Sequence, residues 1–268
     1  MHVLVGTRST YCYTGGKPFN PDFPAVVFIH GAQHDHSVWA LQTRYFAHHG
    51  FSVLAPDLPG HGRSAGPLPD SIEAMAAWVV ELLDVIGVQG ATLVGHSMGS
   101  LIALETVYTA TDRVDRIALM GTAFPMKVSN HLLAAASSDE AAAIEMVNAW
   151  SHSSIAQKPS CPGPGFYVPG VNRRLMRHIS QRTAQPVFHT GFSACNAYAN
   201  GMRAAESVRC PALFILGKQD RMTPPGSAAA LIDAIPHAKI VVLERCGHAI
   251  MAEQPDAALD ALFAFAGE

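Results

Sequence analysis

Short runs of β-branched and apolar residues alternate along the chain with longer segments in which apolar residues recur at the spacing of a helix. Short runs of this kind are typical of buried strands, and the longer segments are typical of amphipathic helices. Strands that alternate with helices are typical of a sheet whose strands run mostly parallel, with helices packed on its faces. The pattern therefore predicts an α/β fold with a mostly parallel central sheet flanked by helices.

The individual elements follow from where each pattern begins and ends. The predicted core strands are residues 25–29, 52–55, 91–94, 116–120, 212–216 and 239–243. The predicted helices include residues 38–49, 71–86, 101–108 and a last helix opened by Pro255. Ser37 is a candidate cap for the first of these helices, and Gly87 is placed to end the second. At the N-terminus, residues 3–5 and 11–13 predict an antiparallel hairpin at the sheet edge.

The alternation stops between about Phe124 and Ser207. This stretch shows no clean strand pattern. It holds an Ala-rich helical segment, a Pro- and Gly-rich segment and an Arg-rich helical segment, at residues 130–150, 159–170 and 171–183. An insertion of this size between two strands indicates a separate layer of helices.

We predict that residues 124–205 form a helical cap inserted into an α/β core, which comprises residues 1–123 and 206–268. Ligands of open α/β sheets bind at the carboxyl edge of the strands, so we expect the cap to cover that edge. The alternative is a packed helical appendage that contacts no ligand.

Composition places the chain among soluble globular proteins. Apolar residues make up 49% and charged residues 15% of the sequence, which supports a sizeable core and argues against disorder. The 18 basic and 21 acidic residues give a formal charge of −3 without a basic stripe, so we expect no nucleic-acid partner.

The compartment is predicted from what the sequence lacks. No apolar run is long enough to span a membrane, and the first residues do not have the pattern of a secretory signal. The five cysteines are scattered and form no C-x-x-C pair, which is typical of neither a disulfide framework nor a zinc site. We therefore expect a cytoplasmic protein without a membrane partner, and its oligomeric state stays open.

A serine flanked by glycines stands where a predicted strand meets a predicted helix. Residues 95–99 read Gly-His-Ser-Met-Gly, directly after the strand 91–94. A turn this tight leaves no room for side chains at its ends, which explains the two glycines, and it exposes the hydroxyl of Ser97 at its apex. The N-terminus of the helix directs N–H groups and a positive dipole toward a developing negative charge. This pattern predicts that Ser97 is a catalytic nucleophile.

A serine hydroxyl needs a base, and the base needs an acid that orients it. For a serine in such a turn, the expected chain order is serine, then acid, then histidine. Asp220 and His248 each follow one of the last two predicted strands. Because the carboxyl ends of parallel strands share one edge, we expect Ser97, Asp220 and His248 to form a catalytic triad. Glu244 and Asp233 are the alternatives to Asp220 as the acid.

Five motifs in this order resemble the α/β-hydrolase fold superfamily, and the likeness covers nearly the whole chain except the cap. They are His30-Gly31, Asp57-Leu58-Pro59-Gly60-His61-Gly62-Arg63-Ser64, Gly95–Gly99, Gly217-Lys218-Gln219-Asp220 and Gly247-His248. Within the superfamily the chain resembles serine esterases with an inserted helical cap. The resemblance implies that the backbone N–H groups of Ala32 and Met98 form an oxyanion hole. It also implies a second acid position after the strand 116–120, where residues 121–123 hold no carboxylate, and this favours Asp220.

These residues predict a serine hydrolase that cleaves a small or medium carboxylic ester or lactone through an acyl-enzyme intermediate. The chemistry needs no metal ion and no organic cofactor. Gln33 and His34 border the predicted oxyanion hole, so we expect them to contact the substrate. Two alternatives stay open: a hydrolase that cleaves a carbon–carbon bond of a ring-cleavage product, and a small-molecule receptor that retains the triad with slow turnover.

Two further groups of polar residues have simpler interpretations. His34, Asp35 and His36 have side chains that suit a divalent ion, but they share one loop without a fourth ligand nearby, so we expect no metal site. The basic cluster within residues 173–182 suits an anion, and a solvated helix face is favoured over that reading. Asp57 is expected to be structural.

Overall fold

The computed structural model describes residues 1–153 and 167–267, in which eight strands form one sheet in the order β1-β2-β4-β3-β5-β6-β7-β8. The strands are β1 (His2–Val5), β2 (Arg8–Tyr13), β3 (Ala25–Ile29), β4 (Ser52–Pro56), β5 (Ala91–His96), β6 (Val114–Met120), β7 (Ala212–Gly217) and β8 (Lys239–Leu243). β2 runs antiparallel to β1 and β4, and all other neighbours are parallel. The predicted fold class and the predicted edge hairpin are both confirmed.

The central strands are apolar along their whole length because both faces of the sheet are covered. Every residue of β3, β4, β5 and β7 is buried, as expected for parallel strands with helices on each side. In the register of the sheet, Ile29 at the end of β3 pairs with Gly95, and His96 at the end of β5 pairs with Met120. The loops that leave these strands therefore begin at one edge.

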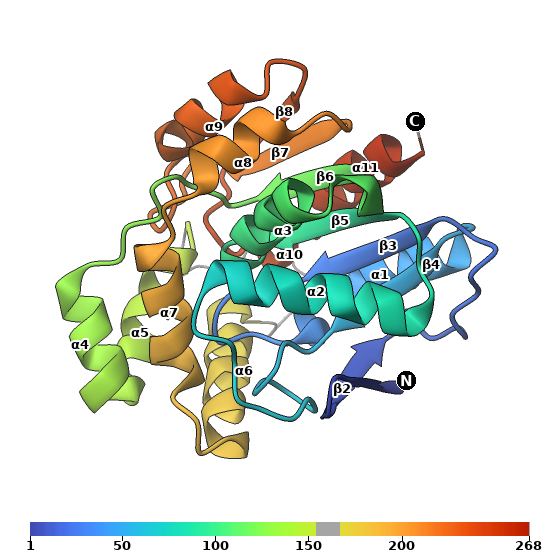
Figure 1. The fold of residues 1–268 in the computed structure, drawn as a ribbon. Coiled ribbons are helices and arrows are strands. Elements are labelled where there is room, and N and C mark those ends of the chain that lie inside the picture. Colours follow the sequence, from blue (N-terminus) through green and yellow to red (C-terminus); the bar gives the residue numbers. More distant parts are fainter. Residues whose placement is uncertain (154–166, 268) are drawn as a thin grey trace.

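Helices cover the two faces of the sheet in separate layers (Figure 1). On one face, α2 (Ile72–Ile86), α3 (Met98–Thr109), α8 (Gly201–Ser207) and α9 (Ala229–Ala234) pack in a cluster that includes Ile72 and Leu82. On the other face lie α1 (Ala40–His48), α10 (Ile250–Glu253) and α11 (Pro255–Ala266), around Phe28, Trp39 and Phe46. Short 3-10 turns, η1 (His36–Trp39), η2 (Thr111–Arg113) and η3 (Pro225–Ala228), complete the core.

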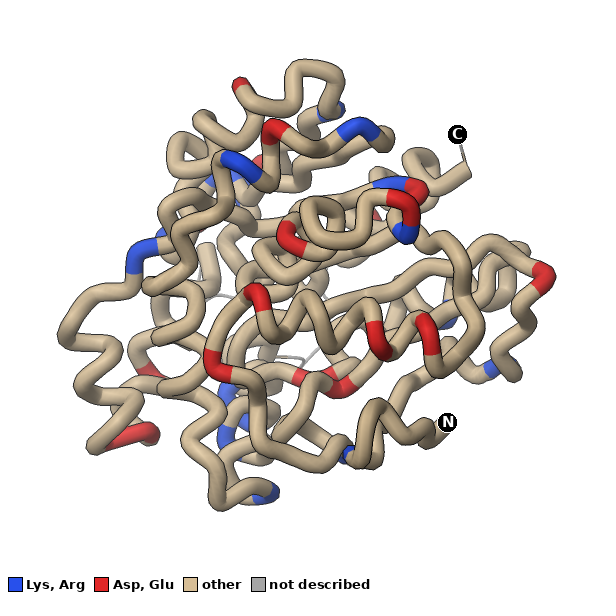
Figure 2. The backbone as a smooth tube through the Cα atoms, viewed as in Figure 1, with Lys and Arg blue, Asp and Glu red and all other residues tan. Residues whose placement is uncertain are grey.

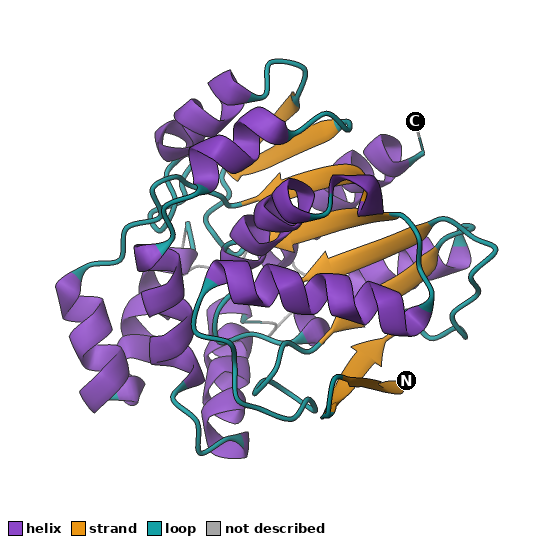
Figure 3. Cartoon of the chain, in the orientation of Figure 1, coloured by secondary structure: helices purple, strands orange, loops and turns teal. Residues whose placement is uncertain are grey.

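Four helices between β6 and β7 form a layer of their own: α4 (Asn130–Ser138), α5 (Glu140–Ser151), α6 (Val168–Arg182) and α7 (Val187–Ala197). They share a small apolar cluster built on Leu132, Ile144, Met176 and Phe188. The arrowheads of the parallel strands point toward this layer (Figure 3). We call these four helices the cap, and the boundaries at residues 124 and 205 stay a prediction.

Two predicted details differ from the structure, and one cap helix was not predicted. The Ala-rich segment is two helices and not one, because the Asp139 carboxylate accepts the N–H of Ala142 and starts a new helix there. Asp35, and not Ser37, caps the turn before α1, since its carboxylate accepts the Ser37 N–H. The helix α7 was not predicted, because Gly191 and small polar residues obscure its apolar face. Most of the Pro- and Gly-rich segment lies outside the described residues.

The part of the chain that the structure describes has no helix both long and apolar enough to cross a membrane. Three cysteines in this part, Cys12, Cys195 and Cys210, carry free thiols. Burial raises the pKa of Cys12 and of Cys195 to about 12, so both stay protonated at neutral pH.

A buried histidine joins the loops that follow β3 and β4. His30 is 0% exposed, its Nε2 accepts the N–H of Leu58 at 3.0 Å, and its Nδ1–H donates to the Gly31 carbonyl at 2.8 Å. Both ring nitrogens are therefore used by the neutral imidazole. Burial lowers the pKa of His30 to about 3, and the nearby ring of His61 acts in the same direction.

We predict that the free energy of unfolding falls as the pH drops below about 6.5. His30 then binds a proton in the unfolded chain, whereas it stays neutral in the folded chain because its pKa is lowered there. His30→Gln should reduce this pH dependence by up to about 1.4 kcal/mol per pH unit, measured by urea unfolding at a series of pH values. His48→Gln, at an exposed site at the end of α1, is the control. Equal slopes for wild type and His30→Gln would contradict the account.

Candidate active site

The turn between β5 and α3 holds Ser97 in a conformation that serine rarely adopts. Its φ is 54° and its ψ is −120°, in a region where a side chain is strained. Glycine is required on both sides: a Cβ on Gly95 would lie 2.1 Å from the Gly99 carbonyl oxygen, and a Cβ on Gly99 would lie 2.2 Å from that of Ile29. The strand, the helix and β3 are thus packed backbone to backbone around the serine.

Hydrogen bonds fix the backbone of Ser97 within this turn. Its N–H donates to the Met120 carbonyl at 2.9 Å, which ties the turn to β6. Its carbonyl accepts the Ser100 hydroxyl at 2.6 Å, and the Ser100 hydroxyl also contacts Thr122 Oγ1 at 2.8 Å. Met98 is the first residue of α3, where a backbone N–H has no intrahelical acceptor. These hydrogen bonds hold the backbone in place, and the side chain of Ser97 stays partly exposed.

The structure brings Asp220 and His248 together at the same edge. His248 Nδ1 lies 2.8 Å from Asp220 Oδ2, and the two residues are 5% and 4% exposed. The other carboxylate oxygen, Asp220 Oδ1, accepts the N–H groups of Met222 and Thr223, each at 2.8 Å. Because carboxylates only accept at neutral pH, His248 Nδ1 carries its proton toward Asp220, which leaves Nε2 as the basic nitrogen of the neutral ring.

Two effects oppose each other at the Asp220 carboxyl. Burial by itself raises the pKa of Asp220, but the charge and hydrogen bond of His248 together with the hydrogen bonds from Thr223 outweigh it. The pKa of Asp220 therefore lies below its ordinary value, and the group is ionised at neutral pH. Glu244 does not compete for the histidine, because it is exposed and its Oε1 lies 2.6 Å from Lys218 Nζ.

The loop that carries His248 is anchored on three sides. The His248 carbonyl accepts the Nε2–H of His96 at 2.8 Å, and burial keeps the pKa of His96 well below its ordinary value, so that ring stays neutral. The Gly247 N–H donates to the buried carboxylate of Glu253. The Ala249 N–H donates to the Ser151 carbonyl at 2.9 Å, at the end of cap helix α5.

Sequence reasoning missed three of these residues. Thr223 Oγ1 donates to Asp220 Oδ2 at 2.8 Å and lies 3.1 Å from His248 Nδ1. An aspartate side chain often accepts hydrogen bonds from residues two or three positions after it, which forms a common type of turn. The spacing of Asp220 and Thr223 could therefore have predicted this contact. Glu253 and His96 act on the backbone of a loop distant in the sequence, and no local pattern reveals such a contact.

Ser97 and His248 line one cavity of about 340 Å³, together with Ala32. Residues of cap helices also line it, Leu132, Trp150 and Phe192 among them, together with the chain that leads into the cap and the loop after β7. A cavity of this size suits a small molecule, and most of its wall is apolar. The cap therefore lines part of the same cavity as Ser97 and His248.

Gln33 lies behind this cavity and connects two layers of the fold. It is 0% exposed, its φ is 58°, and its Nε2 lies 3.0 Å from Glu140 Oε1, 3.1 Å from the Met176 carbonyl and 2.8 Å from Ser180 Oγ. All three partners belong to cap helices α5 and α6. Gln33 is not among the described residues that line the cavity, and the expected contact with substrate stays a prediction.

His34 opens onto a different, larger cavity of about 660 Å³ between α1, α6 and α10. Its Nε2 lies 2.9 Å from Asn172 Oδ1, and burial lowers the pKa of His34 to about 4. The ring is neutral at pH 7. Its role in substrate binding also stays a prediction.

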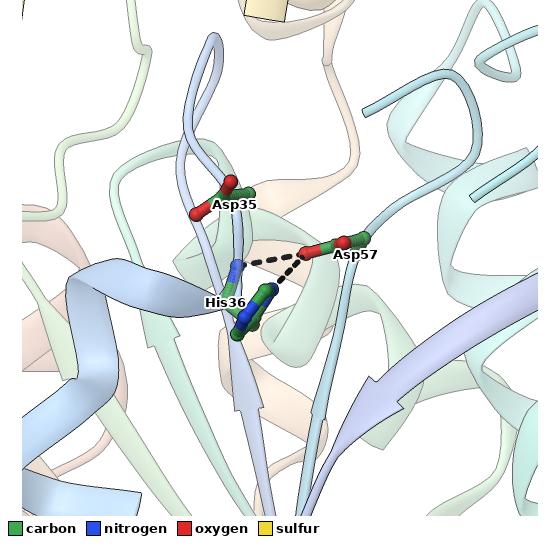
Figure 4. Close-up of side chains that lie close together, drawn as sticks. All are labelled: Asp35, His36 and Asp57. Carbon is green, nitrogen blue, oxygen red and sulfur yellow. Dashed lines mark hydrogen bonds and ion pairs between the residues drawn. The ribbon is translucent and has the colours of Figure 1, made fainter. Parts of the chain in front are cut away.

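The side chains that could act as metal ligands are not the three considered from the sequence, because Asp57 takes the place of His34. Ligand atoms of Asp35, His36 and Asp57 lie within 4.8 Å of one another. Figure 4 shows these three side chains and the interactions that join His36 to Asp57. These atoms already have partners in the protein: Asp57 Oδ1 accepts both the N–H and the Nδ1–H of His36, at 2.9 and 2.7 Å. Asp57 Oδ2 accepts the Arg63 N–H at 2.8 Å. We interpret Asp57 as the anchor that joins the loops after β3 and β4.

Two of the four arginines of α6 are paired within the cap. Arg173 and Arg177 both contact Glu145 of α5, at 2.8 and 2.9 Å. Over the whole described chain, charged residues of both signs are spread over many elements (Figure 2). The cluster thus has the charge balance of a solvated helix face.

Comparisons with known proteins agree on fold and on reaction class. The sequence profile of the alpha/beta hydrolase fold matches residues 24–255. The chain is 25% identical over 86% of its length to (E)-2-((N-methylformamido)methylene)succinate hydrolase of Acinetobacter baylyi, covering 86% of that protein. It is 28% identical over 88% of its length to 3-oxoadipate enol-lactonase 2 of the same organism, covering 86% of it.

A solved structure extends the likeness. The enzyme Est816, described as degrading N-acyl homoserine lactones, superimposes with a TM-score of 0.81 at 26% identity. The match covers 99% of this chain and 100% of the other.

We predict that Gln33→Leu lowers the free energy of unfolding by about 2 kcal/mol, because it removes a fully buried amide that contacts Glu140, Ser180 and the Met176 carbonyl. Urea unfolding followed by tryptophan fluorescence measures the change. Gln181→Leu, at an exposed site on the same cap helix α6, is the matched control and should stay within about 0.5 kcal/mol of wild type. Equal stability of the two variants would show that the contact carries no weight.

Proposed function

The chain belongs to the α/β-hydrolase fold family, and from this and the geometry of its site we propose that it is a serine hydrolase acting on a small or medium carboxylic ester or lactone. The observation that carries the proposal is the pair formed by Asp220 and His248, which faces the same cavity as the strained, partly exposed Ser97. A serine, a neutral imidazole and a buried carboxylate in this chain order form the minimal set for acyl transfer.

In the proposed first half-reaction, the Ser97 hydroxyl oxygen attacks the carbonyl carbon of the substrate while His248 Nε2 accepts the hydroxyl proton. The negative charge moves to the carbonyl oxygen of a tetrahedral intermediate. Asp220 holds the imidazole in the tautomer with Nε2 free and stabilises the imidazolium that forms. When the intermediate collapses, the bond to the alcohol oxygen breaks, and His248 gives its proton to that oxygen.

The oxyanion is assigned to two backbone N–H groups. Met98 offers the first N–H of α3, where the helix dipole adds to the attraction for negative charge. Ala32 lines the cavity beside Ser97 and leads directly into Gln33, which the cap helices hold. This support predicts that the seating of the cap affects the position of the Ala32 N–H.

In the second half-reaction a water molecule loses a proton to His248 and attacks the acyl carbon. The collapse of the second tetrahedral intermediate breaks the bond to Ser97 Oγ, which recovers its proton from His248. The product is a carboxylic acid and, from a lactone, a hydroxy acid. The lactone class is supported by the printed activities of two relatives, an enol-lactonase and an N-acyl homoserine lactone degrading enzyme.

We predict that Ser97→Ala abolishes hydrolysis of p-nitrophenyl acetate and butyrate, and that Asp220→Asn lowers kcat at least about 10³-fold, because the amide no longer stabilises the charged imidazole. Release of p-nitrophenolate measures both. Glu244→Gln, on the neighbouring exposed loop, is the matched control for loss of a carboxylate and should retain wild-type rates. Activity retained by Ser97→Ala would overturn the mechanism. A wild type that binds such esters without turnover would favour a receptor.

A further inference from the structure

The cavity beside Ser97 is lined by two cations that no carboxylate balances. Lys127 and Arg221 are both exposed at this cavity, and its described lining contains no aspartate or glutamate. The lining therefore favours a ligand that carries negative charge.

Some cations of the cap are held in ion pairs, and the two at the cavity are not, in the part of the chain that the structure describes. Arg173 and Arg177 share the carboxylate of Glu145, whereas neither Lys127 nor Arg221 forms an ion pair with any residue in the described ranges. Unpaired cations at a cavity whose wall is mostly apolar can bind a charged group of a ligand.

Both cations stand on backbone that the fold holds in place. Lys127 precedes Val128, whose N–H donates to Asn196 Oδ1 on cap helix α7 at 3.1 Å. Arg221 lies between Asp220 and Met222, and the Met222 N–H donates to the Asp220 carboxylate at 2.8 Å. One cation thus comes from the chain leading into the cap and the other from the catalytic loop of the core.

The carboxylate of Asp220 does not form an ion pair with either cation. Both oxygens of Asp220 are occupied, by His248 Nδ1 and the Thr223 hydroxyl on one side and by two backbone N–H groups on the other. Its hydrogen bonds go to His248 and to its own loop, and none goes to Lys127 or Arg221.

We propose that the natural substrate is an ester or lactone that carries a free carboxylate, and that Lys127 and Arg221 bind this carboxylate while its acyl carbonyl lies at Ser97. The inference rests on the proposed function, since it names the substrate class of the same site. The two residues determine specificity and take no part in bond cleavage.

The test uses two esters that differ in one charge, p-nitrophenyl hydrogen adipate and p-nitrophenyl methyl adipate. The quantity measured is the ratio of kcat/KM for the acid to kcat/KM for the methyl ester. We expect a ratio above about 10 in wild type, a loss of about threefold or more in Lys127→Gln and in Arg221→Gln, and a ratio near one in the double variant. Arg174→Gln, an exposed α6 arginine outside the cavity, is the matched control and should keep the wild-type ratio.

A measurement on the wild type alone gives the same information if a variant fails to fold. The ratio should fall steeply between about 0.01 M and about 1 M salt, over which the Debye length shortens from about 30 Å to about 3 Å. A wild-type ratio of one or less, with the methyl ester still hydrolysed, overturns this inference and leaves the proposed function standing. If neither ester is hydrolysed by the wild type, the proposed function fails and the inference fails with it.

Discussion

The site depends on how closely three backbones approach one another where β5 turns into α3. Gly95 and Gly99 leave no space for a Cβ against α3 and β3, so the chain between them must bend sharply outward. Ser97 stands at that bend with a positive φ, and its backbone is bonded to β6. The strain is local, and the sheet that maintains it is buried on both faces. The fixed position of Ser97, the proposed nucleophile, is thus a consequence of packing at the centre of the fold.

The other groups reach this point because parallel strands end at one edge. The loops after β7 and β8 are joined to each other, since the Gln219 N–H donates to the Cys246 carbonyl and a Cβ on Gly217 would meet the Gly247 carbonyl oxygen at 2.2 Å. The two loops therefore hold Asp220 and His248 at a fixed separation before any substrate is bound. Such preorganisation is what electrostatic catalysis requires.

The cap is more than a cover in this arrangement. Gln33, in the loop after β3, contacts both α5 and α6. The carbonyl at the end of α5 accepts a hydrogen bond from the N–H of Ala249, the residue after His248. The cap is thus bonded to the two loops that flank the cavity. Its position and the geometry of the site are coupled through buried polar contacts, which are costly to break.

The sequence predicted the elements whose cause is local. The strand patterns, the Ser71 and Gly87 ends of α2, and the Gly-flanked serine all follow from short-range sterics and periodicity. The break at Asp139 and the partners of Gln33 could not be predicted, because each depends on which distant segment packs nearby. Contacts made across about a hundred residues leave no periodic trace in one sequence, and the same holds for Glu253.

The central claim is that Ser97 is chemically activated, and covalent labelling tests it most directly. A fluorophosphonate transfers its phosphonyl group to a serine whose hydroxyl proton is taken up by a neighbouring base, with loss of fluoride. Mass spectrometry of the digested protein should find one phosphonyl adduct, on the peptide that contains Ser97, and no such adduct in His248→Ala. A protein that stays unlabelled, or that is labelled on another residue, would contradict the account.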